Sequence, residues 1–375
     1  MNTLYKDLIY LLSCAVNGIT PDTAKVQAMD LEKLYRLAKF HTVRAVVCIA
    51  LKRAGVQDKQ FDQAYKKAVR KNIYLDMERS AILSDFEKQG IWYMPLKGSI
   101  LKELYPENGM REMADNDVLY DSTKQSEVKR IMLSMGYSAE SVGKTHHDVY
   151  MKPPVLNFEL HTLLFGAMSE FYDYYENPKR LMKPDEGGKY GFHFSDEDFY
   201  VYMLAHEYKH YSAGGTGLRS LLDCYVFLQH KGDTLNWEYI HEQTKQLDIA
   251  DFEREQRELA EKVFSSATFP ELTECEQELL DYYLTSCTYG TRTRSAENTV
   301  KKHYAKSHSK SKFSFIWARL FPDTEFMKQY YSFFYQHKLL LPVGYVWRWC
   351  KGIATNRKKL QAEMRALRKY DNKKV

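Results

Sequence analysis

Two aspartates separated by one residue, Asp115 and Asp117, are the residues whose types and spacing most directly suggest chemistry. They stand in an otherwise apolar run, Met-Ala-Asp-Asn-Asp-Val-Leu-Tyr, although Asp is disfavoured in strands. Because side chains alternate along a strand, both carboxylates are expected on one face. Neighbouring carboxylates repel each other unless a cation lies between them, and oxygen ligands suit Mg²⁺. The pair therefore predicts a divalent-metal site.

A third carboxylate stands in a second alternating stretch, residues 155–161. There Glu159 shares a face with Asn157 and His161, while the apolar residues take the other face. A strand that places Glu159 beside the aspartates would complete a site for two metal ions. His161 could support Glu159 through a hydrogen bond or simply pack beside it.

A phosphate-binding turn is predicted upstream of the aspartates. Gly98 and Ser99 end one apolar run and open a short helical pattern, so their backbone N–H groups would be free for phosphate oxygens. Lys97 and Arg111 are close in sequence and could neutralise phosphate charge, or either could be an ordinary surface cation. A phosphate cradle with metal carboxylates suggests phosphoryl or nucleotidyl transfer.

The order of these motifs resembles the nucleotidyltransferases of the DNA polymerase β superfamily. More closely, it looks like a bacterial family of uncharacterised nucleotidyltransferases, and the resemblance covers most of the chain. The motifs that carry the closer resemblance are Leu96-Lys97-Gly98, Arg111-x-Met-Ala-Asp115-x-Asp117-x-Leu119 and Glu159-Leu160-His161.

The resemblance implies a Mg²⁺-dependent nucleotidyltransferase. Such an enzyme moves a nucleoside monophosphate from a nucleoside triphosphate to a hydroxyl of an acceptor, here unidentified, and releases pyrophosphate. Asp115, Asp117 and Glu159 would hold two Mg²⁺ ions, and Glu159 would be available as general base. The resemblance also places Lys209 and Arg219 against the nucleotide cleft, where they could meet phosphates.

Three positions depart from the family pattern. The gap from Ser99 to Asp115 is somewhat longer than is common in the superfamily. Asn116 stands between the aspartates where an apolar residue is usual, and Thr162 follows His161 where an aromatic residue is common. None of these departures removes a carboxylate.

Two alternatives remain open at the level of sequence. One is a non-catalytic module that binds a nucleotide or RNA on the same fold. The other is a zinc-dependent hydrolase, because the string from His206 to His210 formally satisfies His-Glu-x-x-His. That interpretation lacks a third ligand, and Lys209 beside the ligands would oppose Zn²⁺.

The elements that must position these residues predict an α+β fold. We expect a small mixed-sheet nucleotidyltransferase core at 91–165, between an N-terminal helical segment at 1–90 and a C-terminal helical domain at 166–375 with a basic tail. The core strands are expected near 91–96, 113–120, 136–140, 147–152 and 155–161, with helices at 99–105 and 123–135. We expect an irregular bridge at 165–191 and a helix at 196–211 that begins at Ser195.

Composition indicates an ordinary soluble globular protein, with 44% hydrophobic and 27% charged residues. No apolar run is long enough to span a bilayer, and the first residues lack the layout of a secretory signal. We therefore expect no membrane insertion and a cytoplasmic protein. The six cysteines form no Cys-x-x-Cys pair, which argues against a structural zinc site or a disulfide framework.

The formal net charge of +5 hides an asymmetry. Residues 290–312 contain seven Lys or Arg against one acidic residue, and residues 348–375 contain ten against two. The rest of the chain is therefore acidic. A basic tail is compatible with a polyanionic partner such as RNA, whereas the simpler interpretation is a flexible loop at 290–312 and a solvated helix end.

Overall fold

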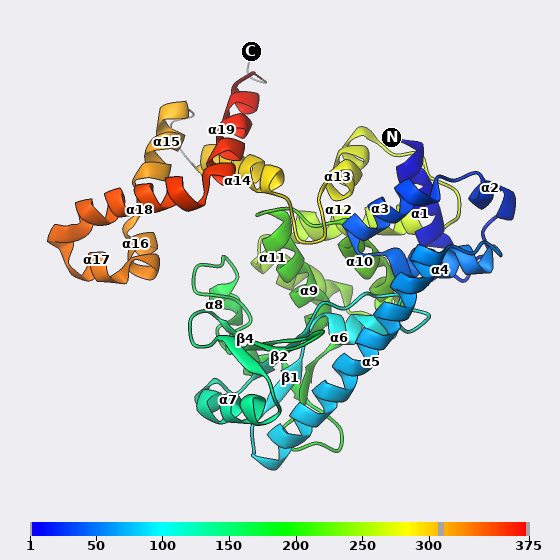
Figure 1. The fold of residues 1–375 in the computed structure, drawn as a ribbon, viewed down its shortest axis with the longest axis horizontal. Helices are drawn as coiled ribbons and strands as arrows, with labels where there is room; N and C mark the ends of the chain where they lie inside the picture. The colour runs from blue at the N-terminus through cyan, green and yellow to red at the C-terminus, as the bar shows by residue number, and fades with distance from the viewer. Residues whose placement is uncertain (1, 307–310, 373–375) are drawn as a thin grey trace. The chain divides into compact units, whose positions relative to one another are not determined.

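The sheet that carries the predicted site has five strands in the order β1-β2-β5-β4-β3 (Figure 1). In this computed structural model, residues 2–306 and 311–372 are described. Strands β2 and β5 are parallel and the other neighbouring pairs are antiparallel, so the mixed sheet and the α+β class are confirmed. The strands are β1 (Tyr93–Pro95), β2 (Asn116–Tyr120), β3 (Ser138–Ser141), β4 (His147–Lys152) and β5 (Leu156–His161).

The two faces of this sheet differ in character because side chains alternate along each strand. Helices α5 (Lys59–Lys88) and α7 (Gln125–Ser134) pack their apolar residues against one face. That face carries Val118, Phe158 and Tyr150, which are fully buried. The opposite face carries Asp117, Glu159 and His161 and is therefore the polar face of the sheet.

The N-terminal helices form as their capping residues predict. Asp22, Asp30 and Asp58 each accept a hydrogen bond from a backbone N–H in the first turn of the helix that follows. His41 is fully buried, and its Nδ1 accepts from the N–H of Leu218 at the start of α10, so it caps that helix from within the core. These helices are α1 (Thr3–Val16), α2 (Thr23–Gln27), α3 (Leu31–His41) and α4 (Arg44–Arg53).

Two further helices border the site. Helix α6 (Gly98–Leu101) follows β1 and continues as a 3-10 turn, and α9 (Asp196–Tyr211) begins after Ser195, whose Oγ accepts from the N–H of Asp198. The bridge expected to be irregular contains a short hairpin of its own. The remaining elements of this part are α8 (Tyr172–Tyr175), β6 (Met182–Pro184), β7 (Phe192–Phe194), α10 (Leu218–Lys231), α11 (Trp237–Gln246), α12 (Ala250–Phe264) and α13 (Glu274–Thr285).

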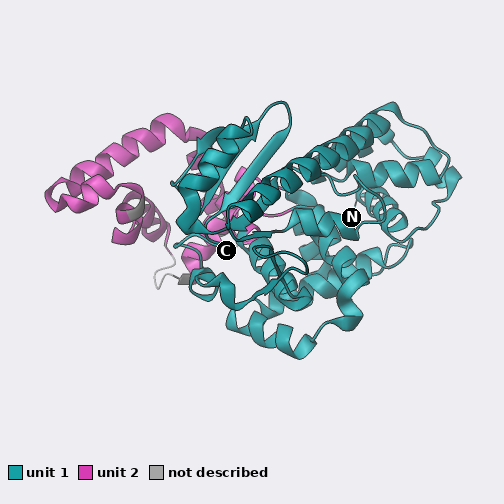
Figure 2. Ribbon diagram, turned by 90° about the horizontal axis from the view of Figure 1, so that it is seen from below, with its two compact units in different colours: residues 1–209, 217–288 teal, residues 210–216, 289–375 magenta. Residues whose placement is uncertain are grey.

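The chain divides into two compact units, drawn in teal and magenta in Figure 2. Unit 1 comprises residues 1–209 and 217–288, and it contains the sheet. Unit 2 comprises residues 210–216 and 289–375. Its helices are α14 (Arg292–Lys306), α15 (Lys312–Leu320), α16 (Thr324–Tyr330), α17 (Ser332–Gln336), α18 (Leu341–Thr355) and α19 (Arg357–Asn372). The domain boundaries expected at 90 and 165 stay predictions.

The basic segment at 290–312 was predicted to be a loop, and that prediction is wrong for its described part. Residues Arg292–Lys306 form helix α14. Ala296, Val300 and Tyr304 recur at a spacing of four, and all three are buried in a core shared with Leu367 of α19. The many cations obscured this apolar stripe in the sequence, although Arg292, Lys301 and Lys302 are exposed to solvent.

Among the described residues, no helix has both the length and the apolar character that crossing a membrane requires.

Candidate functional site

The parallel pairing of β2 with β5 brings two of the predicted carboxylates together. Asp117 lies directly opposite Glu159 in the ladder, so the two side chains share the polar face. With His161 they form a group whose ligand atoms all lie within 4.8 Å of one another. The expectation that a second strand would place Glu159 beside the aspartate pair thus agrees with the register.

Asp117 is the most heavily bonded member of this group. Its Oδ1 accepts from Lys97 Nζ at 2.7 Å and lies 2.8 Å from His161 Nε2. Burial alone would raise the pKa of Asp117, but Lys97 and His161 outweigh burial and hold it well below its usual range. Burial would likewise lower the pKa of Lys97, whereas the charge of Asp117 raises it. The pair is therefore fully ionised at neutral pH.

Asp115 lies immediately before β2, which begins at Asn116, and it is half-buried. Burial and the negative charges of Asp117 and Glu159 raise its pKa to about 7, against the opposing effect of Lys97 and Arg219. The pKa of Glu159 is also raised, by burial and by Asp117. Three acidic groups thus repel one another in a small volume, as expected of a site that binds a cation.

Asn116, which departs from the family pattern, has a structural role on the other face of β2. It is fully buried, and its Nδ2 donates to the backbone carbonyl of Leu75 at 2.9 Å. Arg79 Nη1 donates to its Oδ1 at 2.9 Å. Both partners belong to α5, so the amide ties the strand of the aspartates to the long helix.

The turn before α6 is tightly constrained. Lys97 adopts a φ of 48°, a left-handed conformation that is uncommon for a residue with a side chain. A Cβ at Gly98 would lie 2.6 Å from Arg111 Nη1, so a larger residue there would have to displace a guanidinium that Asp223 holds. Ser99 is buried and its Oγ donates to the carbonyl of Leu96 at 2.9 Å. The chain entering the turn is held beside β2, because the N–H of Leu96 donates to the backbone carbonyl of Asp117. The N–H groups of Gly98 and Ser99, in the first turn of the helix, have no acceptor within the helix.

Arg111 is not an exposed surface cation. Its Nε and Nη2 donate to the two carboxylate oxygens of Asp223, each at 2.9 Å, and Tyr105 donates to the same carboxylate at 2.7 Å. All three residues are buried. Asp223 thus forms a two-pronged pair with Arg111. Arg111 therefore lies behind Gly98 and supports the turn.

Lys209 and Arg219 lie near the carboxylates, as the resemblance implied. Lys209 of α9 is partly buried; burial and the charge of Lys97 lower its pKa, while Glu159 and Asp117 oppose that shift. Arg219 of α10 is close enough to lower the pKa of Asp115, and its Nη1 donates to the carbonyl of Glu112 at 3.4 Å. With Lys97, these side chains place positive charge around the carboxylates.

Two histidines that sequence reasoning missed also lie at the site. His147 is paired with His161 across β4 and β5, and His146 precedes it. Burial and neighbouring lysines lower the pKa of His146 to about 3 and that of His161 to about 4, and burial lowers the pKa of His147. All three rings are therefore neutral near pH 7. In the sequence, these two histidines could have been noticed as a His-His pair at the start of the strand predicted at 147–152.

The zinc-hydrolase alternative finds no support in the geometry. Glu207, which would be its general base, is buried and accepts from Gln256 Nε2 at 2.6 Å and from the Tyr283 hydroxyl at 3.1 Å. Among the described residues, the groups able to hold a metal include neither His206 nor His210. Glu207 is a core residue, not one that faces a substrate.

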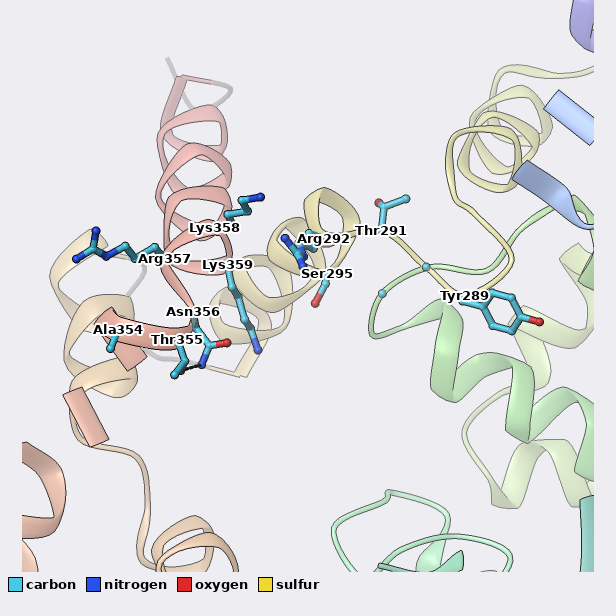
Figure 3. Close-up of a pocket in the computed structure, with 12 residues that line it drawn as sticks. Tyr289, Thr291, Arg292, Ser295, Ala354, Thr355, Asn356, Arg357, Lys358 and Lys359 are labelled. Carbon is cyan, nitrogen blue, oxygen red and sulfur yellow. Dashed lines mark hydrogen bonds between the residues drawn. The ribbon is translucent and has the colours of Figure 1, made fainter. Parts of the chain in front are cut away.

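Unit 2 has a polar pocket of its own, with a volume of about 640 Å³ (Figure 3). It is lined by the first turns of α14 and α19 and by the 214 and 290 segments. In Figure 3, Lys358 points towards the first turn of α14, where Arg292 and Ser295 lie, whereas Arg357 points away. No acidic side chain lines this pocket among the described residues, so its chemistry suits an anion.

Comparison with known proteins gives one match, and it covers well over half of the chain. A family model described as an uncharacterised nucleotidyltransferase matches residues 27–265. This range contains the five-stranded sheet and every side chain of the candidate site described above, from Lys97 to Asp223. No curated protein and no solved structure matches the chain.

Proposed function

We propose a function from the premise that this chain belongs to the uncharacterised nucleotidyltransferase family, a family of enzymes that transfer phosphorus-containing groups. The proposed reaction moves a nucleoside monophosphate from a nucleoside triphosphate to an acceptor hydroxyl and releases pyrophosphate. The site would be the polar face of the sheet at Asp115, Asp117 and Glu159. The relation to the DNA polymerase β superfamily is part of this proposal, and it rests on the order of the motifs.

The donor set fits a divalent cation. Asp117 and Glu159 face each other across a parallel ladder. Burial, and after it the charge of neighbouring acids, raises the pKa of Asp115 and of Glu159, and a bound cation would offset both effects. Hard carboxylate oxygens are the ligands that Mg²⁺ prefers. Mg²⁺ held by these three residues, as two ions, would supply charge neutralisation for the phosphates and for the attacking oxygen.

The chain's own residues would supply positioning and proton transfer. Lys97, Lys209 and Arg219 surround the carboxylates with positive charge and would hold the triphosphate, together with the backbone amides of Gly98 and Ser99. Arg111 would act on the phosphates only indirectly, because its guanidinium is engaged by Asp223 and fixes the turn. Glu159, whose pKa is raised, would accept the proton of the acceptor hydroxyl.

The observation that carries this proposal is the register of Asp117 opposite Glu159. Asp115 lies just before the strand, where the charges of both carboxylates act on it. The test is transfer from each α-³²P-labelled nucleoside triphosphate with Mg²⁺ to lysate fractions of RNA, protein and small molecules. Asp115→Asn and Asp117→Asn should each lower transfer at least about 1,000-fold, because each removes charge needed in the transition state. The thermal midpoint should change little for Asp115→Asn, since that change relieves repulsion.

Retained transfer in both variants would exclude the assignment. Triphosphate binding without transfer to any fraction would favour the alternative of a nucleotide- or RNA-binding module. The matched control is Asp121→Asn, an acid near the end of the same strand that caps the following turn and lies away from the site.

The acceptor class that the rest of the chain favours is RNA. Arg292, Lys358 and Lys359 line the pocket of unit 2, and no acidic residue is among its described lining residues. RNA carries a phosphate on every nucleotide, so several cations on one surface can each contact a different phosphate. Gly214 and Gly290 pack backbone to backbone at this pocket, since a Cβ at Gly290 would lie 2.7 Å from the carbonyl oxygen of Gly214. We therefore propose that unit 2 contacts the phosphate backbone of an RNA acceptor.

Replacing Arg292, Lys358 and Lys359 together by Ala should weaken binding of total cellular RNA and lower the salt dependence of log Kd by up to about three. The measurement is filter binding over a range of KCl concentrations. A control with Lys39, Lys129 and Arg130 of unit 1 changed to Ala carries the same loss of charge. Equal effects in both variants, or transfer of label to protein, would contradict an RNA-binding pocket.

A further inference from the structure

Three histidines converge on the polar face of the sheet. His147 opens β4 and pairs in register with His161 of β5, and His146 comes from the turn before β4. The ring centroids of His146 and His147 are 4.7 Å apart, and those of His147 and His161 are 5.2 Å apart. Each ring offers one nitrogen, and these three nitrogens all lie within 4.8 Å of one another.

Two of these rings have a buried nitrogen that is not hydrogen-bonded. Nδ1 of His147 and Nδ1 of His161 are both inaccessible to solvent and have no hydrogen-bond partner among the residues that the structure describes. A buried polar atom left without a partner costs about 1–3 kcal/mol. Two such atoms in neighbouring rings are unexpected if the histidines serve only as core packing, because most buried polar atoms are paired.

The position of His146 depends on a glycine. A Cβ at Gly166 would lie 3.2 Å from His146 Nδ1, so a larger residue there would press on the ring. The 166 segment therefore leaves room for the imidazole beside the other two. This local arrangement permits the three rings to meet.

We propose that His146, His147 and His161 bind one transition-metal ion of the Zn²⁺ class. Neutral imidazole nitrogens are ligands that Zn²⁺ and its neighbours in the first transition row prefer, whereas Mg²⁺ prefers oxygen. Three protein ligands leave a fourth position open for an oxygen ligand. A water molecule would fill that position, which leaves Glu159 to the carboxylate site.

The spacing of the nitrogens is compatible with such an ion after a small adjustment. Zn–N bonds of about 2.0–2.1 Å in a tetrahedron put ligand atoms about 3.4 Å apart. The observed upper limit of 4.8 Å therefore requires each ring to move inward by less than about 1 Å. Both positive and negative side chains lie near the three rings. Lys97 and Lys209 would repel a bound cation, whereas Asp117 and Glu159 would attract it.

This metal site is independent of the proposed transfer reaction, although it shares His161 with Asp117. A protein with no transferase activity could still bind the ion through the histidines. The two sites also differ in the ion that they select, so they can be separated in one series of measurements.

The test uses the full chain after removal of metals with a chelator and dialysis. Titration with Co²⁺ should give the visible absorption of a nitrogen-ligated, four-coordinate ion, saturating at one equivalent. Addition of Zn²⁺ should abolish the absorption by displacement, and a large excess of Mg²⁺ should leave it unchanged.

Variants identify the ligands. His146→Ala and His147→Ala should each weaken Zn²⁺ binding, measured by competition with Co²⁺, at least tenfold. The control His241→Ala removes an exposed histidine on α11 and should have no effect. His146→Asn and His147→Asn provide smaller changes if an alanine variant loses its native circular dichroism.

Absence of the Co²⁺ absorption in the wild type, or Zn²⁺ affinity unchanged in both histidine variants, would overturn the proposal. Asp115→Asn distinguishes the two sites, because it should abolish nucleotidyl transfer while the Co²⁺ absorption remains. Loss of transfer alone would therefore count against the proposed reaction and not against the histidine site.

Discussion

At the scale of single residues, the site is defined by carboxyl groups in contrasting surroundings. Asp117 is bonded to Lys97 and His161 and stays ionised, whereas the pKa of Asp115 is raised by burial and by its acidic neighbours. Glu207, outside the site, is a third case, because burial raises its pKa to about 8 although Gln256 and Tyr283 donate to it. Side-chain carboxyl groups thus occupy three different settings, which sequence alone does not distinguish.

The protonation of Glu207 predicts a pH dependence of stability. Its pKa is 4.5 when unfolded and about 8 when folded, so between these values the folded state binds the extra proton. Its contribution to the free energy of unfolding is complete below pH 4.5 and is lost as the pH rises to about 8. In Glu207→Gln this group no longer titrates. The free energy of unfolding of the variant should therefore fall less steeply with pH than that of the wild type, by up to about 1.4 kcal/mol per pH unit.

Urea denaturation of the wild type and of Glu207→Gln at pH 5, 6, 7 and 8 measures this difference. The variant should gain relative stability steadily as the pH rises. Glu255→Gln, an exposed change on α12, is the control and should run parallel to the wild type. A constant difference between Glu207→Gln and the wild type at all four pH values would contradict a raised pKa.

At the scale of elements, the site depends on how β2 is held. Asn116 bonds the backbone of Leu75 and the side chain of Arg79, both in α5, so the strand of the aspartates is anchored on its apolar face by a polar contact. Asn116, where the family pattern has an apolar residue, therefore has a polar partner in α5, because Arg79 donates a hydrogen bond to it.

Asn116→Leu should destabilise the protein by about 1–3 kcal/mol, because the Arg79 guanidinium would lose a buried partner. The midpoint of urea denaturation measures it. Asn157→Leu on β5 is the matched control, since its Oδ1 has no hydrogen-bond partner among the described residues and little is lost. An equal or smaller effect of Asn116→Leu than of the control would show that the contact with α5 does not stabilise the strand.

Most elements, and the placement of Glu159 opposite Asp117, could be predicted from the sequence, because period-two alternation, capping aspartates and stop glycines are local signals. The pairing of Arg111 with Asp223 could not, since the two residues are far apart in sequence and become neighbours only through tertiary packing. Helix α14 was missed because its cations outnumber a stripe of three apolar residues. The histidine pair was missed because only the register of β4 with β5 aligns it with His161.

At the scale of the whole molecule, the chain has two units with separate cores. The sheet core of unit 1 includes Phe158 and Leu75, and a core in unit 2 includes Val300, Tyr304 and Leu367. The candidate carboxylates lie in unit 1 and the basic pocket in unit 2. Each unit therefore has hydrophobic contacts of its own that can be weakened selectively.

Leu367→Ala should lower the stability of unit 2 by about 2–5 kcal/mol and leave the transition of unit 1 nearly unchanged. Scanning calorimetry of the full chain should resolve two transitions, of which this variant shifts one. Leu221→Ala, which removes a fully buried side chain in unit 1, should shift the other. A single transition that both variants shift equally would show that the units unfold together.

The parallel pairing of β2 with β5 also determines when the site can form during folding. Asp117 and His161 are 44 positions apart in sequence, and parallel strands cannot be joined by a tight turn. The antiparallel pairing of β4 with β5 is local and closes a much shorter loop. We expect the hairpin of β4 and β5 to form first during folding. It would bring Glu159 and the histidines together before β2, with Asp117, pairs with β5. Assembly of the candidate site therefore waits for the slow, long-range closure of the sheet.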